Sequence, residues 1–502
     1  MNTERFSSCL RELGAVWDGL LPEARHIVDD SREVGPGDIF VLRQGATALS
    51  QAQMRRFCES AVAAGACAVI ADPGADVPTS LPVIRLAEPH RHLGALAEGF
   101  YGSPSRRMKV VAVTGTNGKT TTTYLIEALA RNLGLRVGVL GTISYRYPGY
   151  SEPAPNTTPG TLKLYRLMAA MADAGCDIVA MEVSSHGIMQ GRVDGVLFDA
   201  AIWNNLGTDH LDFHGTREAY ALAKQRLFDH YLVEAFRAGK RPVAVANADD
   251  PEVVSHIRDA HPESWGGRVV SFSSATAQAD IALRDLQWRN GAWQLEIHDA
   301  QGTVIPSSLS LIGAYNAANA AGAIAALHAL GYGLRDIAEA LPRVPQIPGR
   351  MECVAKAPTV IVDFAHTPEA LENALDAARG CVHDGGRLIA VFGAGGDRDP
   401  SKRPMMGAAA AKLSDLVYVT SDNPRTENPD DIIRQIMAGI PEGVNACAIT
   451  DRKAAIRAAV RCASGNDVIL VAGKGHEDYQ IIGTQKQHFD DREVCRDALR
   501  GE

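Results

Sequence analysis

An apolar strand that runs directly into a glycine-rich turn constrains the fold of this chain more than any other feature. Residues 109–113 read Lys-Val-Val-Ala-Val, and Gly115-Thr-Asn-Gly-Lys-Thr120 opens a helical pattern that continues through Ala130. Gly-Lys-Thr at a strand–helix junction is typical of loops that hold phosphate groups, because the N–H groups of the helix end point at the anion. The usual spacing of Gly, four residues and Gly-Lys-Ser/Thr would need a glycine at Val113. The sequence therefore predicts a nucleotide site on the parallel sheet of an α/β fold, with a phosphate loop shorter than the usual one.

The side chains of this loop suit ATP and magnesium. The Lys119 ammonium would bridge the β- and γ-phosphates, and the Thr120 hydroxyl would coordinate Mg²⁺. A tight turn without a ligand is the structural alternative, but the sequence stands at the junction that a phosphate loop requires. We predict an ATP-binding loop made of Gly115, Thr116, Asn117, Gly118, Lys119, Thr120 and Thr121.

Two later segments supply candidate metal ligands. The apolar run from Ile178 ends in Glu182, where a phosphate-loop fold needs a second magnesium contact, although a solvated glutamate at a strand end is the alternative. His210 and His214 are spaced i, i+4, which could suggest zinc. The segment lacks the H-E-x-x-H general base and a nearby cysteine, which disfavours zinc. We expect one of the two imidazoles to help hold a magnesium–nucleotide complex and the other to be structural.

The composition is that of an ordinary globular protein. Of 502 residues, 46% are hydrophobic and 22% are charged, and this length suggests two to four domains, of which we expect three. The net charge of -9 disfavours a surface devoted to nucleic acid, so small-molecule partners are expected. The 9 cysteines form no C-x-x-C pair and are expected to be free thiols. A polar N-terminus and the absence of a long apolar run predict a cytoplasmic protein without membrane insertion. We expect a monomer, although the sequence does not give the oligomeric state.

Strand-like runs alternate with helical patterns in three segments, which predicts an α/β fold with three domains. Residues 1–105 form a small N-terminal α/β domain. Residues 106–345 form a central phosphate-loop domain of the ATPase type, with parallel strands at 109–113, 137–140, 178–181, 200–203 and 243–246. The three prolines and one glycine of 341–349 suit a stiff linker. Residues 346–502 form a Rossmann-like C-terminal domain, with strands at 360–363, 388–392, 416–420 and 468–472.

The short loop, the strand-end glutamate and the histidine pair together resemble the Mur ligase family, which includes the folylpolyglutamate synthetases. Its members carry Gly-Thr-Asn-Gly-Lys-Thr in place of the longer phosphate loop, which accounts for the spacing. The resemblance implies that Lys224 carries a carbamate formed from CO₂ and holds metal together with Thr120, Glu182 and His210. A carbamate is a carboxylate and can lie beside a second magnesium ion that an ammonium would repel. The sequence alone instead makes Lys224 a solvated helix residue.

The resemblance also implies how the nucleotide is enclosed and used. Asn316 and Asn319 would lie near the adenine, and Arg350 and Asp363 would reach the nucleotide from the third domain. Closure of the domains would keep water away from an activated carboxylate. In this family ATP phosphorylates a carboxylate, an amine attacks the acyl phosphate, and phosphate leaves. We expect Lys119, His210 and Lys224 to be the catalytic residues.

The acceptor is indicated by segments that resemble the uridine-nucleotide-binding members of the family. Asp30-Ser-Arg32 with Pro36-Gly-Asp38 carries this likeness, but after Gly45 the chain reads Ala-Thr-Ala-Leu-Ser50 where relatives carry an Asp-Gly pair. Hydroxyls and a guanidinium suit a substrate rich in phosphate and carboxylate oxygens. The residues implied to bind the UDP-muramoyl dipeptide are Ser31, Asn156, Thr157, Thr158, Ser184, Gln190 and Arg192.

The amine is indicated by Asp422-Asn-Pro-Arg425, which in this family marks enzymes that add meso-diaminopimelate. Arg425 suits the distal carboxylate of that amine through two parallel hydrogen bonds, and Glu477 suits its distal ammonium. Arg398 would lie between the amine and the reacting phosphate. A polar loop after a strand, without a ligand, is the structural alternative. The residues implied to bind the amine are Arg398, Asp422, Asn423, Pro424, Arg425, Gly473 and Glu477.

The resemblance thus implies an ATP- and magnesium-dependent ligase that adds meso-diaminopimelate to UDP-N-acetylmuramoyl-L-alanyl-D-glutamate. Alternatives within the family are enzymes that add L-lysine or the final dipeptide, since lysine lacks only the carboxylate that Arg425 would bind. A folylpolyglutamate synthetase would lack the N-terminal domain. An alternative of another class is a nucleotide-gated switch protein that hydrolyses ATP without forming a bond.

Overall fold

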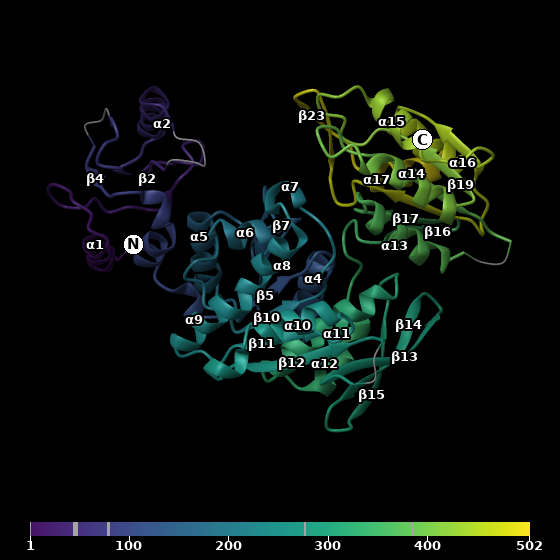
Figure 1. Ribbon diagram of the computed structural model, residues 1–502, viewed down its shortest axis with the longest axis horizontal. Helices are drawn as coiled ribbons and strands as arrows, with labels where there is room; N and C mark the ends of the chain where they lie inside the picture. Colours follow the sequence, from purple (N-terminus) through teal and green to yellow (C-terminus); the bar gives the residue numbers. More distant parts are fainter. Residues whose placement is uncertain (1, 44–48, 78–80, 276–277, 383–384, 502) are drawn as a thin grey trace. The chain divides into compact units, whose positions relative to one another are not determined.

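The computed structural model describes residues 2–43, 49–77, 81–275, 278–382 and 385–501. The chain divides into two compact units. The first comprises Met1–Ala282, Ile297–Val304 and Asn319–Ala340, and the second comprises Leu283–Glu296, Ile305–Ala318 and Leu341–Glu502. Figure 1 colours the chain from purple at the N-terminus to yellow at the C-terminus. Among the described residues, no helix combines the length and the apolar character that crossing a membrane requires.

The N-terminal part of the first unit is a small parallel sheet with helices. Within the described residues its strand order is β1-β2-β3-β4, and the paired strands run parallel. Strand β3 consists of four consecutive apolar residues, all of them buried. The elements are α1 (Thr3–Glu12), β1 (Ile27–Val28), β2 (Ile39–Val41), α2 (Gln51–Ala63), β3 (Ala68–Ala71), β4 (Val83–Arg85) and α3 (Leu93–Tyr101).

The strand that leads into the phosphate loop lies inside the central sheet. Strand β5 pairs in parallel with β10 on one side and β9 on the other, and β11 and β6 continue the parallel core. These five strands match the five sequence-predicted ones, because apolar runs covered on both faces read as continuous hydrophobic segments. They are β5 (Lys109–Thr114), β6 (Val137–Leu140), β9 (Ile178–Glu182), β10 (Ala200–Trp203) and β11 (Val243–Asn247).

Additional strands make the sheet mixed rather than purely parallel. In the described part of the chain the order is β15-β14-β13-β12-β11-β10-β5-β9-β6-β7-β8, and β7 and β8 pair antiparallel. These strands were not predicted from the sequence, because half-exposed strands carry alternating polar residues instead of an apolar run. They are β7 (Ser144–Tyr147), β8 (Tyr150–Pro153), β12 (Arg268–Ser273), β13 (Ile281–Arg289), β14 (Ala292–Asp299) and β15 (Val304–Leu309).

Helices connect the central strands and place side chains at their carboxyl ends. Helix α5 packs its apolar side chains, including Leu164 and Met168, into the same core as alternate residues of β5, β9, β10 and β11. The helices are α4 (Lys119–Asn132), α5 (Thr161–Asp173), α6 (Ser185–Met189), α7 (Leu211–His214), α8 (Arg217–Arg226), α9 (Leu232–Arg237), α10 (Pro251–Asp259), α11 (Tyr315–Ala329) and α12 (Leu334–Ala340). A π-helical turn, Leu227–Tyr231, joins α8 to α9.

The C-terminal sheet of the second unit is covered on both faces, as the Rossmann-like prediction requires. Its strand order among the described residues is β16-β17-β21-β18-β19-β20, with β17, β21, β18, β19 and β20 parallel. Alternate strand residues face two separate cores. One core contains α13, α14 and α15 side chains such as Leu371, Met406 and Ile432, and the other contains α16 and α17 side chains such as Ile456 and Val494.

The sequence-predicted strands of this part are all present. The strands are β16 (Glu352–Lys356), β17 (Thr359–Asp363), β18 (Leu388–Phe392), β19 (Leu416–Val419), β20 (Ala446–Ala448), β21 (Val468–Ala472), β22 (Tyr479–Ile482) and β23 (Gln485–His488). The helices are α13 (Pro368–Arg379), α14 (Lys402–Leu413), α15 (Pro429–Met437), α16 (Arg452–Cys462) and α17 (Asp491–Arg500), several of which are labelled in Figure 1. The α/β class with three sheet-containing regions is thus confirmed, whereas the domain boundaries at 105 and 345 stay predictions.

Candidate active site

The predicted phosphate loop joins β5 to α4. Gly115 has φ of +146° and Gly118 has φ of +82°, backbone conformations that favour glycine. Gly118 is the N-cap of α4, and no side chain of the cap bonds to the first helical turn. The loop therefore leads into the N-terminus of α4, the end of a helix that favours a phosphate group.

Lys119 and Thr120 lie at the start of α4 and point into different surroundings. Lys119 Nζ donates to the carbonyl oxygens of Gly115 and Thr116, at 2.8 and 2.9 Å. Thr120 Oγ1 donates to Glu182 Oε2 at 3.1 Å, and both residues are buried. Glu182 is therefore not the solvated glutamate of the alternative interpretation. A buried carboxylate beside a hydroxyl fits magnesium, which prefers oxygen ligands.

Asparagine side chains pack against the loop from two later segments. A Cβ atom at Gly118 would lie 2.2 Å from Asn319 Oδ1 and 2.8 Å from Asn204 Nδ2. Asn204 Nδ2 donates to Thr122 Oγ1 at 2.9 Å and to Asn319 Oδ1 at 3.4 Å. Asn319 was predicted to lie near the adenine, and the structure places it against the phosphate loop. Asn204 was missed, because an asparagine after a strand carries no distinctive sequence signal.

We expect Gly118→Ala to weaken ATP binding about tenfold or more. An alanine here must keep a positive φ, and its Cβ must displace both asparagine side chains. Backbone strain of this kind costs on the order of 1–3 kcal/mol. The matched control is Gly134→Ala at the other end of α4, where φ is +84° and nothing lies within 4 Å of the added Cβ. Calorimetric titration with ATP should show weaker binding for Gly118→Ala alone, while thermal melts of Gly134→Ala report the cost of the positive φ that both variants share. Equal ATP affinities would contradict the assignment of the loop.

Three histidines gather beside the metal candidates. The ring of His186 lies 4.7 Å from that of His210 and 5.6 Å from that of His214. Partial burial in this cluster lowers the pKa of each of the three imidazoles, so they are neutral near neutral pH, the form that binds metal. His214 Nε2 lies 3.0 Å from Ser185 Oγ, which suits a structural histidine, and His210 on the exposed side is the candidate for magnesium.

Lys224 is buried, with 1% of its surface exposed, so the interpretation as a solvated helix residue is wrong. Its Nζ donates to the carbonyl oxygen of Gly115 at 2.9 Å and lies 4.3 Å from the centre of the Tyr220 ring. Burial, assisted by the charge of Lys119, lowers the pKa of Lys224 well below its ordinary value. Helix α8 thus brings a second lysine to the carbonyl that Lys119 also contacts, which the sequence separation of 109 residues conceals.

The residues predicted to bind the acceptor in the central region come together beside Glu182. Thr158 Oγ1 donates to the Glu182 carbonyl oxygen at 3.0 Å and accepts from Ser184 N–H at 3.0 Å. Arg192 donates to the Thr158 carbonyl oxygen at 2.8 Å and, through Nε, to Gln190 Oε1 at 2.9 Å. In the neighbouring segment, Tyr145 donates to the Asn156 carbonyl oxygen, and Thr157 Oγ1 lies 3.1 Å from Thr142 Oγ1.

The N-terminal residues of the predicted acceptor site are described only in part. Ser31 lies, half-buried, in the turn after β1, where Asp30 Oδ1 accepts the Arg32 N–H at 2.9 Å. Asp29 forms an ion pair with Arg43 at 2.6 Å. The departure from the family pattern after Gly45 involves residues 44–48, which lie outside the described residues.

The second unit contains the other residues predicted to reach the nucleotide. Asp363, at the end of β17, accepts the N–H groups of Met351 at 2.7 Å and Ala365 at 2.8 Å. The guanidinium carbon of Arg350 lies 4.6 Å from the centre of the Phe364 ring. Asn316 donates to the Ile312 carbonyl oxygen at 2.7 Å. Asp363 therefore fixes the backbone next to Arg350, and these two predicted residues are brought together.

The residues predicted to bind the amine meet at the carboxyl ends of β19 and β21. Asn423 Nδ2 donates to Glu477 Oε2 at 2.9 Å, and Arg425 donates to the Gly396 carbonyl oxygen at 2.7 Å. A Cβ atom at Gly473 would lie 2.5 Å from Asp422 Oδ2, so this glycine permits close approach of the two loops. Pro424 is buried, and Arg398 is exposed on the loop after β18.

Two buried cations that support these loops were missed. Arg403, 2% exposed, donates to Glu427 Oε2 at 2.8 Å and to the Gly395 carbonyl oxygen at 3.2 Å. Lys474 is fully buried, and its Nζ lies 3.2 Å from Asn423 Oδ1 and 3.3 Å from Glu477 Oε2. Lys474 directly follows the predicted residue Gly473, and Arg403 lies five positions after the predicted residue Arg398. Nothing in the sequence shows that these two cations are buried.

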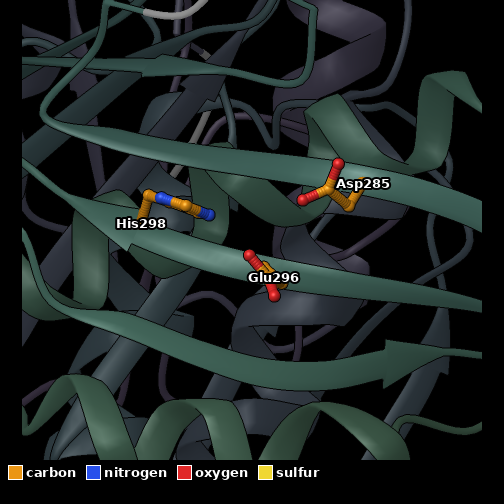
Figure 2. A group of neighbouring side chains, drawn as sticks. All are labelled: Asp285, Glu296 and His298. Atoms are coloured by element: carbon orange, nitrogen blue, oxygen red, sulfur yellow. The ribbon is translucent and has the colours of Figure 1, made fainter.

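A further group of possible cation ligands lies on an antiparallel hairpin. Asp285 of β13 and Glu296 and His298 of β14 offer ligand atoms within 4.8 Å of one another (Figure 2). None of the three belongs to the residue set predicted for magnesium. Asp285 is exposed, and charged groups of this kind are common on open surfaces, so we assign no site to them.

Family models match both principal parts of the chain. The Mur ligase middle domain matches residues 113–327, and the glutamate ligase domain of Mur ligases matches residues 349–475. The first match contains the phosphate loop, Glu182, His210 and Lys224. The second contains the loops that follow β18 and β19.

Similar proteins extend the match to nearly the whole chain. The UDP-N-acetylmuramoyl-L-alanyl-D-glutamate--2,6-diaminopimelate ligase of Parasynechococcus marenigrum (strain WH8102) is 44% identical over 491 residues, which cover 95% of each chain. A solved structure of an enzyme of that name is 33% identical, covers 95% of each chain and has a TM-score of 0.66. A MurF ligase from Thermotoga maritima in complex with ADP shares the fold at 20% identity, with a TM-score of 0.67 over 95% of this chain and 97% of that one. The protein therefore belongs to the Mur ligase family.

Proposed function

We propose that this protein is an ATP-dependent ligase that joins meso-diaminopimelate to UDP-N-acetylmuramoyl-L-alanyl-D-glutamate. The observation that carries the proposal is that the loops after β19 and β21 present the Arg425 guanidinium and the Glu477 carboxylate, the latter bonded by Asn423. The distal end of diaminopimelate offers the complementary carboxylate and ammonium. Relatives named for this substrate pair, 44% identical in one case, support the proposal.

The reaction proceeds in two transfers that the site residues can support. The D-glutamyl carboxylate attacks the γ-phosphorus of ATP, which forms an acyl phosphate and releases ADP. The amine then attacks the acyl carbon, loses a proton and expels phosphate. Lys119 would stabilise charge on the transferring phosphoryl group, and the wall formed by Thr158, Ser184 and Arg192 would orient the acceptor beside it.

Magnesium bound at Thr120, Glu182 and His210 would neutralise phosphate charge during the first transfer. The Thr120 hydroxyl and Glu182 carboxylate oxygens lie 3.1 Å apart, and the neutral imidazole of His210 adds a third candidate ligand. The ADP complex of the Thermotoga maritima relative supports a nucleotide in this fold. The cytoplasmic location and the monomeric state stay predictions.

Lys224 is proposed to act as a carbamate. Its neutral amine would attack CO₂ at carbon and lose a proton, which yields a carboxylate on the nitrogen. An ammonium at this place would repel metal, whereas a carbamate adds an oxygen ligand. The burial of Lys224 and its position beside Gly115 support the proposal.

We predict that Lys224→Ala is inactive and that formate or acetate partly restores its activity, because a small carboxylate can occupy the space that the side chain leaves. Lys119→Ala is the matched control, since added carboxylate cannot replace its cation. An independent readout is the carbamate carbon signal in NMR spectra of enzyme incubated with ¹³C-bicarbonate. A spectrum of the wild-type enzyme without that signal would contradict the carbamate.

The proposed function is tested by phosphate release from ATP with magnesium and the UDP-muramoyl dipeptide. Three parallel reactions contain meso-diaminopimelate, L-lysine or no amine. We expect strong release with meso-diaminopimelate only. Release with L-lysine would keep the ligase chemistry but overturn the role of Arg425, whereas equal release in all three reactions would identify an ATPase that forms no bond.

A further inference from the structure

A fully buried ion pair lies behind the two loops that carry the proposed amine-binding residues. Arg452, the first residue of α16, donates from Nε and Nη2 to the two carboxylate oxygens of Asp491, the first residue of α17, at 2.7 Å each. Both side chains are 0% exposed. Asp491 lies at a helix N-terminus, where a carboxylate is stabilised. This fork-to-fork geometry holds the guanidinium in one orientation.

The same guanidinium also contacts the backbone of two strand ends. Arg452 Nη2 donates to the carbonyl oxygen of Ala472 at 2.9 Å, and Nη1 donates to that of Ser421 at 3.3 Å. Ala472 is the last residue of β21, and Ser421 follows β19 by two positions. Strand β18 lies between β21 and β19 in the sheet. Arg452 therefore links two strand ends that no ladder of sheet hydrogen bonds joins directly.

The residue after each of these carbonyls begins an amine-binding loop. Asp422 follows Ser421, and Gly473 follows Ala472. The loops then contact each other through Asn423 and Glu477 and are bound to β22, where Gln480 donates to the Asp422 carbonyl oxygen at 2.6 Å. A change in the spacing of the two strand ends would therefore alter the positions of the guanidinium and carboxylate that face the amine.

We infer that Arg452 is a positioning residue for amine recognition, which sets the distance between the loop of Asn423 and Arg425 and the loop of Glu477. The inference rests on the proposed function, because it concerns the same amine. Arg452 does not touch the substrate. It acts through two backbone carbonyls, with Asp491 holding its guanidinium in place.

The chain offers a matched control at the opposite ends of the strands of the same sheet. Arg387 donates to Asp467 Oδ2 at 2.8 Å and to the carbonyl oxygen of Cys462 at 2.7 Å. Asp467 immediately precedes β21, and Arg387 immediately precedes β18. This ion pair thus fixes amino ends of the sheet, whereas Arg452 fixes carboxyl ends.

The test compares Arg452→Lys with Arg387→Lys. Lysine keeps the charge that Asp491 requires but cannot donate to a carboxylate fork and two carbonyls in one plane. We expect Arg452→Lys to raise KM for meso-diaminopimelate about 10- to 100-fold, because the two amine-binding loops would no longer be aligned with each other. KM for ATP and for the UDP-muramoyl dipeptide should change less than about twofold. Arg387→Lys should leave all three KM values near those of the wild type. A uniform rise of all KM values in Arg452→Lys, or an equal effect of Arg387→Lys, would overturn the inference.

A second variant guards against loss of folding. Arg452→Met with Asp491→Leu removes both buried charges and keeps similar volume, which is often tolerated in protein interiors. We expect this double variant to melt cooperatively and to share the selective rise in KM for the amine. A double variant that folds with a normal KM for the amine would overturn the inference.

Amide hydrogen exchange tests the positioning role of Arg452 independently of the proposed function, because the measurement needs no substrate. In Arg452→Lys, amides of residues 421–427 and 473–478 should exchange faster than in the wild type, while those of Arg387→Lys should not. Unchanged exchange would overturn the positioning role even if the enzyme uses diaminopimelate. If wild-type enzyme ignores diaminopimelate but the exchange result holds, the proposed amine fails and the link between the loops stands.

Discussion

Replacement of Lys119 by alanine should reduce the rate of acyl phosphate formation by about 100- to 1000-fold. The γ-phosphoryl group would lose its main cationic contact, and loss of one preorganised charge-stabilising contact typically has an effect of this size. In the structure the Lys119 ammonium lies on the carbonyl oxygens of Gly115 and Thr116, at the edge of the loop that would hold the phosphates. Rapid-quench measurement of ADP formation in a single turnover reports this step.

Lys109→Ala is the matched control for this variant. Lys109 stands at the start of β5, ten residues before Lys119, and its Nζ donates to the Leu330 carbonyl oxygen at 2.7 Å. The same charge is lost at the opposite end of the strand, so ADP formation should stay near the wild-type rate. Near-normal ADP formation by Lys119→Ala would refute the role of the loop lysine.

Replacement of Arg425 by alanine should abolish most of the preference for meso-diaminopimelate over L-lysine. The two amines differ at the distal carboxylate, for which Arg425 offers charge-assisted hydrogen bonds. Loss of these bonds is expected to lower the ratio of kcat/KM for meso-diaminopimelate to kcat/KM for L-lysine roughly 100-fold, which corresponds to about 3 kcal/mol. Most of this change should come from a raised KM for diaminopimelate, because ATP and the UDP-muramoyl dipeptide do not depend on this guanidinium.

Arg434→Ala is a suitable control, since Arg434 lies on α15 with a side chain 74% exposed and paired to Asp431. It removes an arginine from the same part of the chain without touching the amine-binding loops. The preference for diaminopimelate should therefore be unchanged. Competition between the two amines in one reaction, with products separated by chromatography, measures the ratio directly, and an undiminished preference in Arg425→Ala would exclude the proposed contact.

Much of the fold was predictable because its central strands carry their signal locally. Strands β5, β9, β10 and β11 are runs of apolar residues covered on both faces, and such runs are recognisable without knowledge of their neighbours. Strands β13 to β15 alternate polar and apolar residues next to turns, and the hairpin β22–β23 is largely polar and exposed. Their pairing depends on partners that the local sequence does not identify, which is why they were missed.

The candidate site was predictable where residue type and strand position coincide. Glu182 and the Gly115–Thr120 loop follow apolar strands, and the structure brings Thr120 to Glu182. Lys224 is different, because its helix looks solvated in sequence and only tertiary packing buries the ammonium next to Gly115. Arg403, Arg452 and Lys474 were missed for the same reason: a buried cation is recognisable only when its partners are known.

The measurement that tests the central claim most directly follows oxygen from the acceptor to phosphate. The UDP-muramoyl dipeptide is labelled with ¹⁸O in both oxygens of each D-glutamyl carboxyl group and incubated with ATP, magnesium and meso-diaminopimelate. We predict that mass spectrometry detects the diaminopimelate-containing product and one ¹⁸O atom in each released phosphate, because the acyl phosphate retains a carboxylate oxygen. Release of unlabelled phosphate without a new amide product would contradict the assignment of this protein as a ligase.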